Sequence, residues 1–209
     1  MSMSSAMEQD GVNRGVVLGG VVAGVLAYLL GYLITYLWKA AAVADALQGI
    51  NVLAQLLGVE AIPTWKGVAW LYYSAHFVAI KLPSIGGASQ RIDFIETADD
   101  PNLVALYFLV VVVLVGAGAV FTARRRQPGS SVGTDALTGA MITLGYGSVA
   151  TIGAFLSTHG VEGADISIAP DPVTAVLLAG LVYPAVCGAI GGLLTRAITA
   201  RERPSPPSG

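Results

Sequence analysis

The sequence predicts an all-α membrane protein, an integral helical bundle of four or five transmembrane helices with a further helical segment on its outer face. Two observations predict this class. Hydrophobic residues make up 55% of the 209 residues and charged residues only 11%, whereas an ordinary soluble domain carries about 25% charged residues. Four long runs contain no Asp, Glu, Lys or Arg at all. A free soluble domain is therefore excluded, and the net charge of −2 argues against a nucleic-acid partner.

Each charge-free run is long enough to cross a bilayer, because a hydrocarbon core about 30 Å thick needs about 20 helical residues. The predicted spans are 15–38, 101–123, 136–158 and 172–195. The second span contains the β-branched stretch Val110–Val113, which is typical of strands in water. An open strand edge has no hydrogen-bonding partner in lipid, so we expect a helix there as well.

Residues 15–200 are expected to form one transmembrane helical domain. The N-terminal residues 1–14 and the proline-containing residues 201–209 are predicted to be disordered tails. Within the last span, Pro184 removes one backbone hydrogen bond and is expected to kink the helix.

The outer segment, residues 40–100, contains two shorter charge-free stretches, 46–59 and 67–80. Both are too short to span a bilayer. The first has the spacing of an amphipathic helix, and the second is rich in Trp and Tyr rings, which prefer the lipid headgroup level. The candidate interfacial site in the second stretch is Trp70, Tyr73 and His76. The pattern allows an interfacial, a re-entrant or a spanning segment, the last being a fifth span that starts near Ala61.

Basic residues predict the orientation of the spans. With four spans and cytoplasmic termini, seven of the eleven Lys and Arg residues lie inside, including the run Arg124–Arg126 that directly follows the second span. Nine of the thirteen acidic residues then lie outside. We therefore expect a multi-pass protein of the cell membrane with an acidic outer surface.

Small residues recur at four-residue spacing in the predicted spans. Close approach over such residues supplies packing energy between helices in lipid. The predicted helix-packing residues are Gly20, Gly24, Gly139, Gly147, Gly180, Gly188 and Gly192. Packing within the bundle is the simpler interpretation, and a seam for a homo-oligomer or a membrane-protein partner is the alternative.

Tyrosines at 28, 32 and 36 form a ladder on the first span. We expect Tyr32 and Tyr36 near the outer headgroups beside Trp38. Tyr28 lies deep enough in the span to need a hydrogen-bond partner.

The third span is the most polar, and Thr143, Tyr146 and Thr151 are the candidate lining of a neutral-solute path. Ion and proton pathways usually carry ionisable residues within spans, and these runs carry none of the four charged residue types. An energised transporter is therefore disfavoured.

No cofactor and no metal site is expected. His159, Glu162 and Asp165 are spaced by three residues, but an acidic loop is more often simply solvated than a cation site. His76 is expected to be a satisfied interfacial histidine, and Cys187 an inert packing residue.

The segments 31–38 (GYLITYLW) and 65–78 (WKGVAWLYYSAHFV) are similar to a group of small multi-span membrane proteins of halophilic archaea whose function is uncharacterised. The similarity runs from the first span to the last. It implies a salt-rich habitat, in keeping with the acidic outer face, and it supplies no catalytic residue.

Three functions follow as hypotheses. The first is a non-enzymatic membrane scaffold or accessory subunit, in contact with membrane lipid. The alternative is a small channel or neutral-solute permease, which requires a water-accessible path along the third span. A membrane enzyme or metal-dependent sensor would require His76 or His159 within reach of two acidic side chains.

Overall fold

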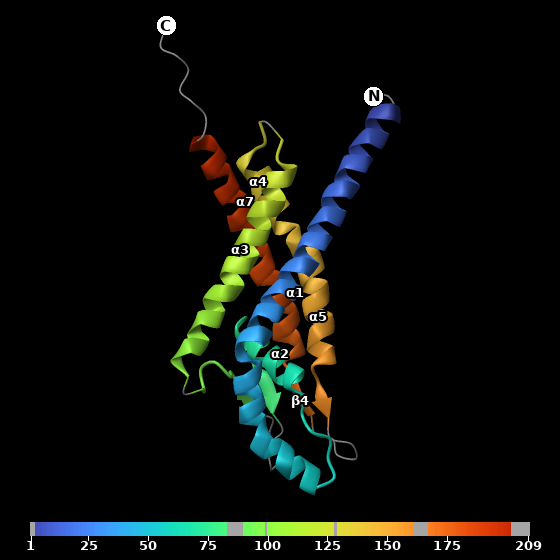
Figure 1. Cartoon of the computed structure of the whole chain (residues 1–209). Helices are drawn as coiled ribbons and strands as arrows, with labels where there is room; N and C mark the ends of the chain where they lie inside the picture. Colours follow the sequence, from blue (N-terminus) through green and yellow to red (C-terminus); the bar gives the residue numbers. More distant parts are fainter. Residues whose placement is uncertain (1–2, 83–89, 99, 128, 161–166, 202–209) are drawn as a thin grey trace.

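The computed structural model describes residues 3–82, 90–98, 100–127, 129–160 and 167–201. The described chain is mostly helical. Four helical stretches are long and apolar enough to cross a membrane: Arg14–Leu56, Pro101–Arg125, Val132–Leu156 and Pro172–Thr199. The first stretch begins and the last one finishes at the same end of the bundle (Figure 1).

Helix α1 spans Met3–Leu56 and is much longer than predicted. It already begins within residues 1–14, where the sequence predicts a disordered tail, and it continues through 39–56 without a break. Its second half contains no proline and mostly good helix formers, so nothing stops it after the apolar run. The Asn51 side chain bonds both the N–H and the carbonyl of Ile62, which holds the chain where it turns back. Residues 202–209 of the predicted C-terminal tail lie outside the described residues.

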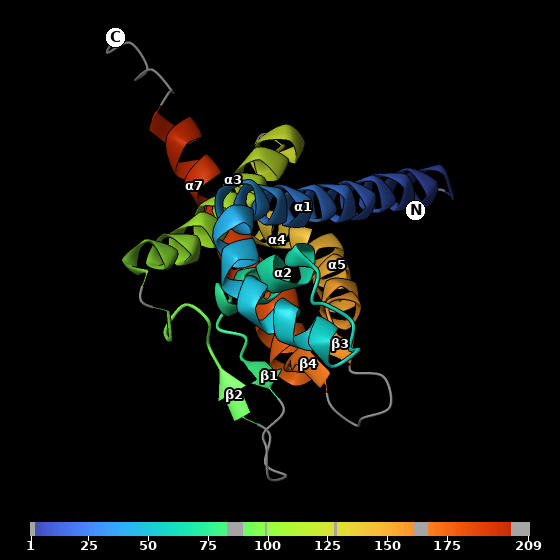
Figure 2. The ribbon, with the colours of Figure 1, turned by 60° about the horizontal axis from the view of Figure 1, so that its bottom comes forward.

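Helix α2, Thr64–Ser74, lies in the segment for which the sequence allows an interfacial, a re-entrant or a spanning course. Eight consecutive residues, from Gly67 to Ser74, are buried. The second half of α1 lies across α2 at the end of the bundle away from the α1 start (Figure 2). Just after α2 the backbone of Phe77 takes φ 56°, a left-handed conformation that reverses the chain. Helix α2 therefore enters the bundle and leaves by the same end.

A small antiparallel sheet corrects the all-α prediction. It has strand order β2-β1-β4-β3, and its strands are β1 (Ile80–Leu82), β2 (Gln90–Ile92), β3 (His159–Gly160) and β4 (Ser167–Pro170). Lys81 pairs with Arg91 on one side and with Ala169 on the other. The sheet thus joins the segment after α2 to the segment that follows α5.

The remaining helices complete the bundle. Their bounds are η1 Pro101–Val104, α3 Ala105–Arg125, α4 Val132–Ala140, α5 Ile142–Leu156, α6 Pro172–Thr174, η2 Ala175–Val182 and α7 Tyr183–Arg201. A turn at Met141 divides the predicted third span into α4 and α5. The π-helical η2 ends at Val182, two residues before Pro184. The nitrogen of Pro184 has no hydrogen and cannot donate a helical hydrogen bond to the preceding turn.

Candidate functional site

A cluster of four tyrosines and one histidine lies in the middle of the bundle, where α2 meets α1 and α5. Its members, hereafter the tyrosine–histidine cluster, are Tyr28, Tyr72, Tyr73, His76 and Tyr146. All five are buried, and their side chains are 0 to 6% exposed. The rings of Tyr28 and Tyr72 meet edge to face with centroids 5.4 Å apart. The cluster therefore brings together residues of three helices that are far apart in sequence.

The hydrogen bonds of His76 form a closed ring. Its Nδ1 lies 2.8 Å from the carbonyl oxygen of Tyr72, so Nδ1 carries the proton and donates. In the neutral imidazole Nε2 then accepts, and the Tyr146 hydroxyl donates to it at 2.7 Å. The Tyr72 hydroxyl in turn donates to the Tyr146 oxygen at 2.8 Å. The ring needs no ionised group, and both nitrogens of the neutral imidazole have a partner.

Tyr28 and Tyr73 form the second part of the network. The Tyr73 hydroxyl donates to the carbonyl oxygen of Ala150 in α5, so it can accept the hydrogen bond that Tyr28 donates at 3.1 Å. The deep partner that the sequence analysis requires for Tyr28 is thus a side chain of α2. The Tyr32 hydroxyl bonds the carbonyl of Trp65 at the opposite end of α2.

Two glycines make room for these phenol groups. A Cβ at Gly153 would lie 2.6 Å from the Tyr28 hydroxyl and 2.8 Å from the Tyr73 hydroxyl. A Cβ at Gly31 would overlap the Tyr72 hydroxyl. Neither glycine is among the predicted helix-packing residues, because the importance of each depends on the ring that faces it.

The first two turns of α2 bond to the chain that leaves α5. Lys66 Nζ donates to the Thr158 carbonyl at 2.7 Å, and Trp70 Nε1 donates to the Ser157 carbonyl at 2.9 Å. Carbonyls at a helix C-terminus lack helical partners and attract cationic donors. The candidate interfacial residues Trp70, Tyr73 and His76 are buried contacts between packed segments of the chain.

The predicted helix-packing glycines all lie at contacts between helices of this chain. Gly20 and Gly24 approach the α5 backbone at Met141 and Ile142, where an added Cβ would overlap the main chain. Gly139 and Gly188 face each other across α4 and α7. Gly192 packs on the Asp135 backbone, and Gly147 on Gly180. These contacts serve packing within the bundle.

The candidate solute path is only partly brought together. Tyr146 is fully buried and engaged by Tyr72 and His76. Thr143 and Thr151 are half-buried, and the Thr143 hydroxyl is a buried atom without a hydrogen-bond partner among the described residues. The central residue of the path is thus enclosed by protein.

The second histidine lies far from this network. His159 Nε2 donates to the Glu60 carbonyl at 3.2 Å. Glu162 and Asp165, the other members of the predicted acidic group, lie outside the described residues. Within the described part of the chain, no three His, Cys, Asp or Glu side chains are grouped to hold a metal ion.

Two buried aspartates tie the ends of the bundle together, and the sequence analysis missed their roles. Asp135, which is 1% exposed, forms ion pairs with Arg126 Nε at 3.3 Å and with Arg196 Nη1 at 3.4 Å. At the other end, Asp171 lies 2.9 Å from Lys81 Nζ. Burial opposes ionisation of Asp171, but the Thr174 N–H and Lys81 outweigh it and lower its pKa to about 2. Both contacts join segments distant in sequence.

Comparison with known families matches residues 1–199 to a family of unknown function, DUF7978. The match covers nearly the whole chain, so the protein belongs to this family. No curated protein and no solved structure matches the chain.

Proposed function

We propose that this DUF7978 protein is an integral membrane protein of the cell membrane that acts as a non-enzymatic scaffold or accessory subunit. The observation that carries the proposal is the closed tyrosine–histidine cluster. Its imidazole and phenol groups are engaged with one another or with backbone carbonyls. A catalytic site or a conducting path needs polar groups that face a substrate or water, and this network is committed to holding α2 between α1 and α5.

The four long apolar helices support the membrane placement. Many apolar side chains on their outer faces are exposed, such as Phe108 at 69% and Val112 at 67%, which is expected where lipid replaces water as the solvent. The run Arg124–Arg126 favours the cytoplasmic side for the end at which α1 begins and α7 finishes. The acidic outer loops and the similarity to proteins of halophilic archaea support a salt-rich habitat.

The partner of an accessory subunit needs a contact surface, and the outer half of α1 offers one. Ile50 and Leu53 of α1 are 56% and 58% exposed, and Leu57 in the turn that follows α1 is 69% exposed. Their spacing puts them on one face of the chain beyond the predicted first span. We name these three residues the outer ridge. A hydrophobic helix of a second membrane protein is the partner that this surface fits.

Gentle extraction from native membranes, followed by native mass spectrometry of the intact assembly, tests the accessory role. We expect a second polypeptide at fixed stoichiometry that is lost from Leu53→Gln and retained by Leu137→Gln. Leu137 is a matched control because it is also exposed, at 64%, but lies on α4. A lone chain or a homo-oligomer in all three samples contradicts the accessory role.

A small channel or neutral-solute permease is the second candidate. The unpartnered hydroxyl of Thr143 favours it, because a buried polar atom without a protein partner can bind water. Flux of small neutral solutes into liposomes, compared between the native chain and Thr143→Val, tests it. Flux that Thr143→Val abolishes supports the channel, and no flux above empty liposomes rejects it.

A further inference from the structure

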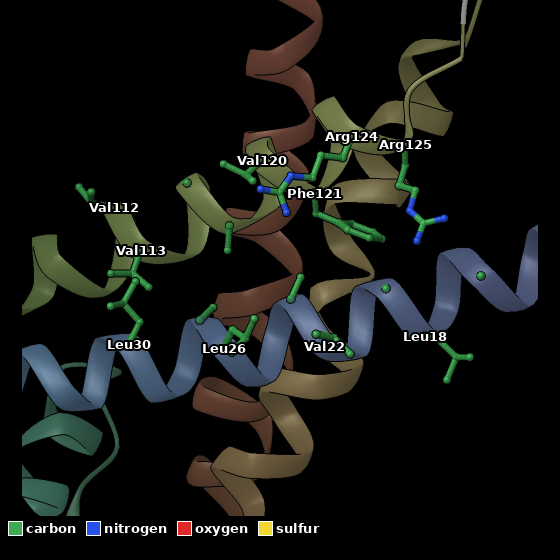
Figure 3. A pocket seen from close by; sticks show the side chains of 16 residues that line it. Leu18, Val22, Leu26, Leu30, Val112, Val113, Val120, Phe121, Arg124 and Arg125 are labelled. Carbon is green, nitrogen blue, oxygen red and sulfur yellow. The ribbon is translucent and has the colours of Figure 1, made fainter.

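A long apolar groove runs between α1 and α3, away from the tyrosine–histidine cluster. Its volume is about 880 Å³. The walls are apolar on both sides, with the Phe121 ring among aliphatic side chains, and Arg124 and Arg125 lie at one end (Figure 3). On α1 the groove extends from Gly15 to Leu30, which at 1.5 Å per residue is about 22 Å. That length exceeds the depth of one leaflet's hydrocarbon layer, about 15 Å.

The two arginines make this groove different from the ordinary lipid-facing surface. The third arginine of the run, Arg126, is bound to Asp135. Among the described residues, neither Arg124 nor Arg125 forms an ion pair. The Arg125 guanidinium lies against α1, with its nitrogens 3.0 Å and 3.6 Å from where Cβ atoms at Gly19 and Gly15 would be. The positive charge of Arg125 therefore lies at the end of the apolar groove.

Gly116 is a second, independent feature of the groove. It lies in the middle of α3, and a Cβ there would meet nothing within 4 Å. A glycine inside a helix costs about 0.5–1 kcal/mol relative to alanine, and at Gly116 no contact with the described residues requires it. Its absent side chain deepens the groove on the α3 side.

We propose that this groove binds an anionic glycerophospholipid of the arginine-side leaflet. The phosphate is held by the guanidinium groups of Arg124 and Arg125, and one hydrocarbon chain of the lipid lies along the groove past Gly116. Guanidinium groups donate several hydrogen bonds to phosphate oxygens, and the apolar walls match a hydrocarbon chain. The proposal rests on the membrane placement above, but it is independent of the accessory role and of any channel activity.

Native mass spectrometry of the purified full chain tests the proposal, with phosphatidylglycerol and phosphatidylcholine of identical acyl chains as probes. We expect phosphatidylglycerol to bind more tightly to the native chain. The double variant Arg124→Gln/Arg125→Gln should weaken it about tenfold, because it loses charge-assisted hydrogen bonds. Arg14→Gln is the charge control, since Arg14 is exposed at the same end but does not line the groove. It should change the affinity less than about twofold.

A groove-filling pair of variants tests the acyl chain. Gly116→Leu should prevent phosphatidylglycerol from binding. Gly49→Leu is the matched control: Gly49 also has open space at Cβ, but it lies on the outer half of α1, away from the groove, so phosphatidylglycerol should still bind. A cooperative thermal unfolding transition in both variants is the control that they are folded. Val112→Phe is a second filling variant that leaves the glycine in place.

Three results would overturn the proposal. Equal affinity for phosphatidylglycerol and phosphatidylcholine would mean that the arginines do not select an anionic lipid. Displacement of phosphatidylglycerol by inorganic phosphate, with Gly116→Leu still binding the lipid, means a simple anion site without a chain groove. A dimer that forms in the native chain, excludes lipid and dissociates in Gly116→Leu means that a second copy occupies the groove.

Discussion

The Nε2 atom of His76 lies 2.7 Å from the hydroxyl oxygen of Tyr146, and this contact joins the end of α2 to the middle of α5. It is the central hydrogen bond of the ring, because Tyr146 also accepts from Tyr72. A helix that enters a bundle and leaves by the same end exposes polar backbone groups at its tip. His76 satisfies one of them, the Tyr72 carbonyl.

Removing the Tyr146 hydroxyl should destabilise the protein. Tyr146→Phe leaves His76 Nε2 without a donor and the Tyr72 hydroxyl without an acceptor, and each buried unsatisfied group costs about 1–3 kcal/mol. Thermal unfolding in detergent, followed by tryptophan fluorescence, measures the loss. Tyr36→Phe is the control, because Tyr36 is half-buried and makes no hydrogen bond to described residues. Equal stability of the two variants would mean that the ring contributes nothing.

Alanine at Gly24 should disrupt the packing of α1 on α5. The added Cβ would overlap the Ile142 carbonyl and the Tyr146 backbone nitrogen, and such overpacking costs about 1–3 kcal/mol. Gly49→Ala adds the same methyl group where nothing lies within 4 Å, so it should stabilise the helix by about 0.5–1 kcal/mol. The unfolding midpoint of each variant is measured against the native chain, and we expect it to fall for Gly24→Ala and to rise for Gly49→Ala. A stabilising Gly24→Ala contradicts the close backbone approach.

Neutralising Asp135 should loosen the end of the bundle formed by α3, α4 and α7. Asp135→Asn removes the carboxylate with which Arg126 and Arg196 form ion pairs. Charge-assisted hydrogen bonds of this kind contribute about 1.5–3 kcal/mol, so the unfolding midpoint should fall clearly. Asp45→Asn is the control, because Asp45 is exposed and forms no ion pair within the described residues. Limited proteolysis after Arg126, compared between the two variants, locates the change.

Acid should remove the contribution of Asp171. Its pKa is lowered to about 2 in the folded chain, from about 3.9 in an unfolded chain. A carboxyl whose pKa is lowered by folding contributes fully above the unfolded value and loses the contribution as pH falls toward the folded value. The stability difference between the native chain and Asp171→Asn should therefore be about 2 kcal/mol at pH 6 and should vanish near pH 2. A difference that stays constant over this range rejects the ionised contact with Lys81.

The sequence by itself determined the helical class, the four apolar stretches and the glycine spacing. Local composition is sufficient for these features, since charge-free runs of that length exclude an ordinary soluble domain. The packing glycines were also found from spacing alone, because close helix approach requires small residues at regular intervals. The same reasoning identified Tyr28 as a residue that needs a partner, but it could not identify that partner as Tyr73.

Only the tertiary structure decided the course of residues 39–100. Trp70, Tyr73 and His76 have the composition of an interfacial segment, since Trp, Tyr and His are amphipathic in either setting. Whether their polar atoms face headgroups or other side chains depends on Gly31, Gly153 and Tyr146, which are 41 to 80 residues away from the residues of α2 and its C-terminal turn that they contact. The small sheet also escaped prediction, because its strands have two to four residues. Such short strands carry almost no periodicity, and they form because α2 and α5 bring their flanking segments together.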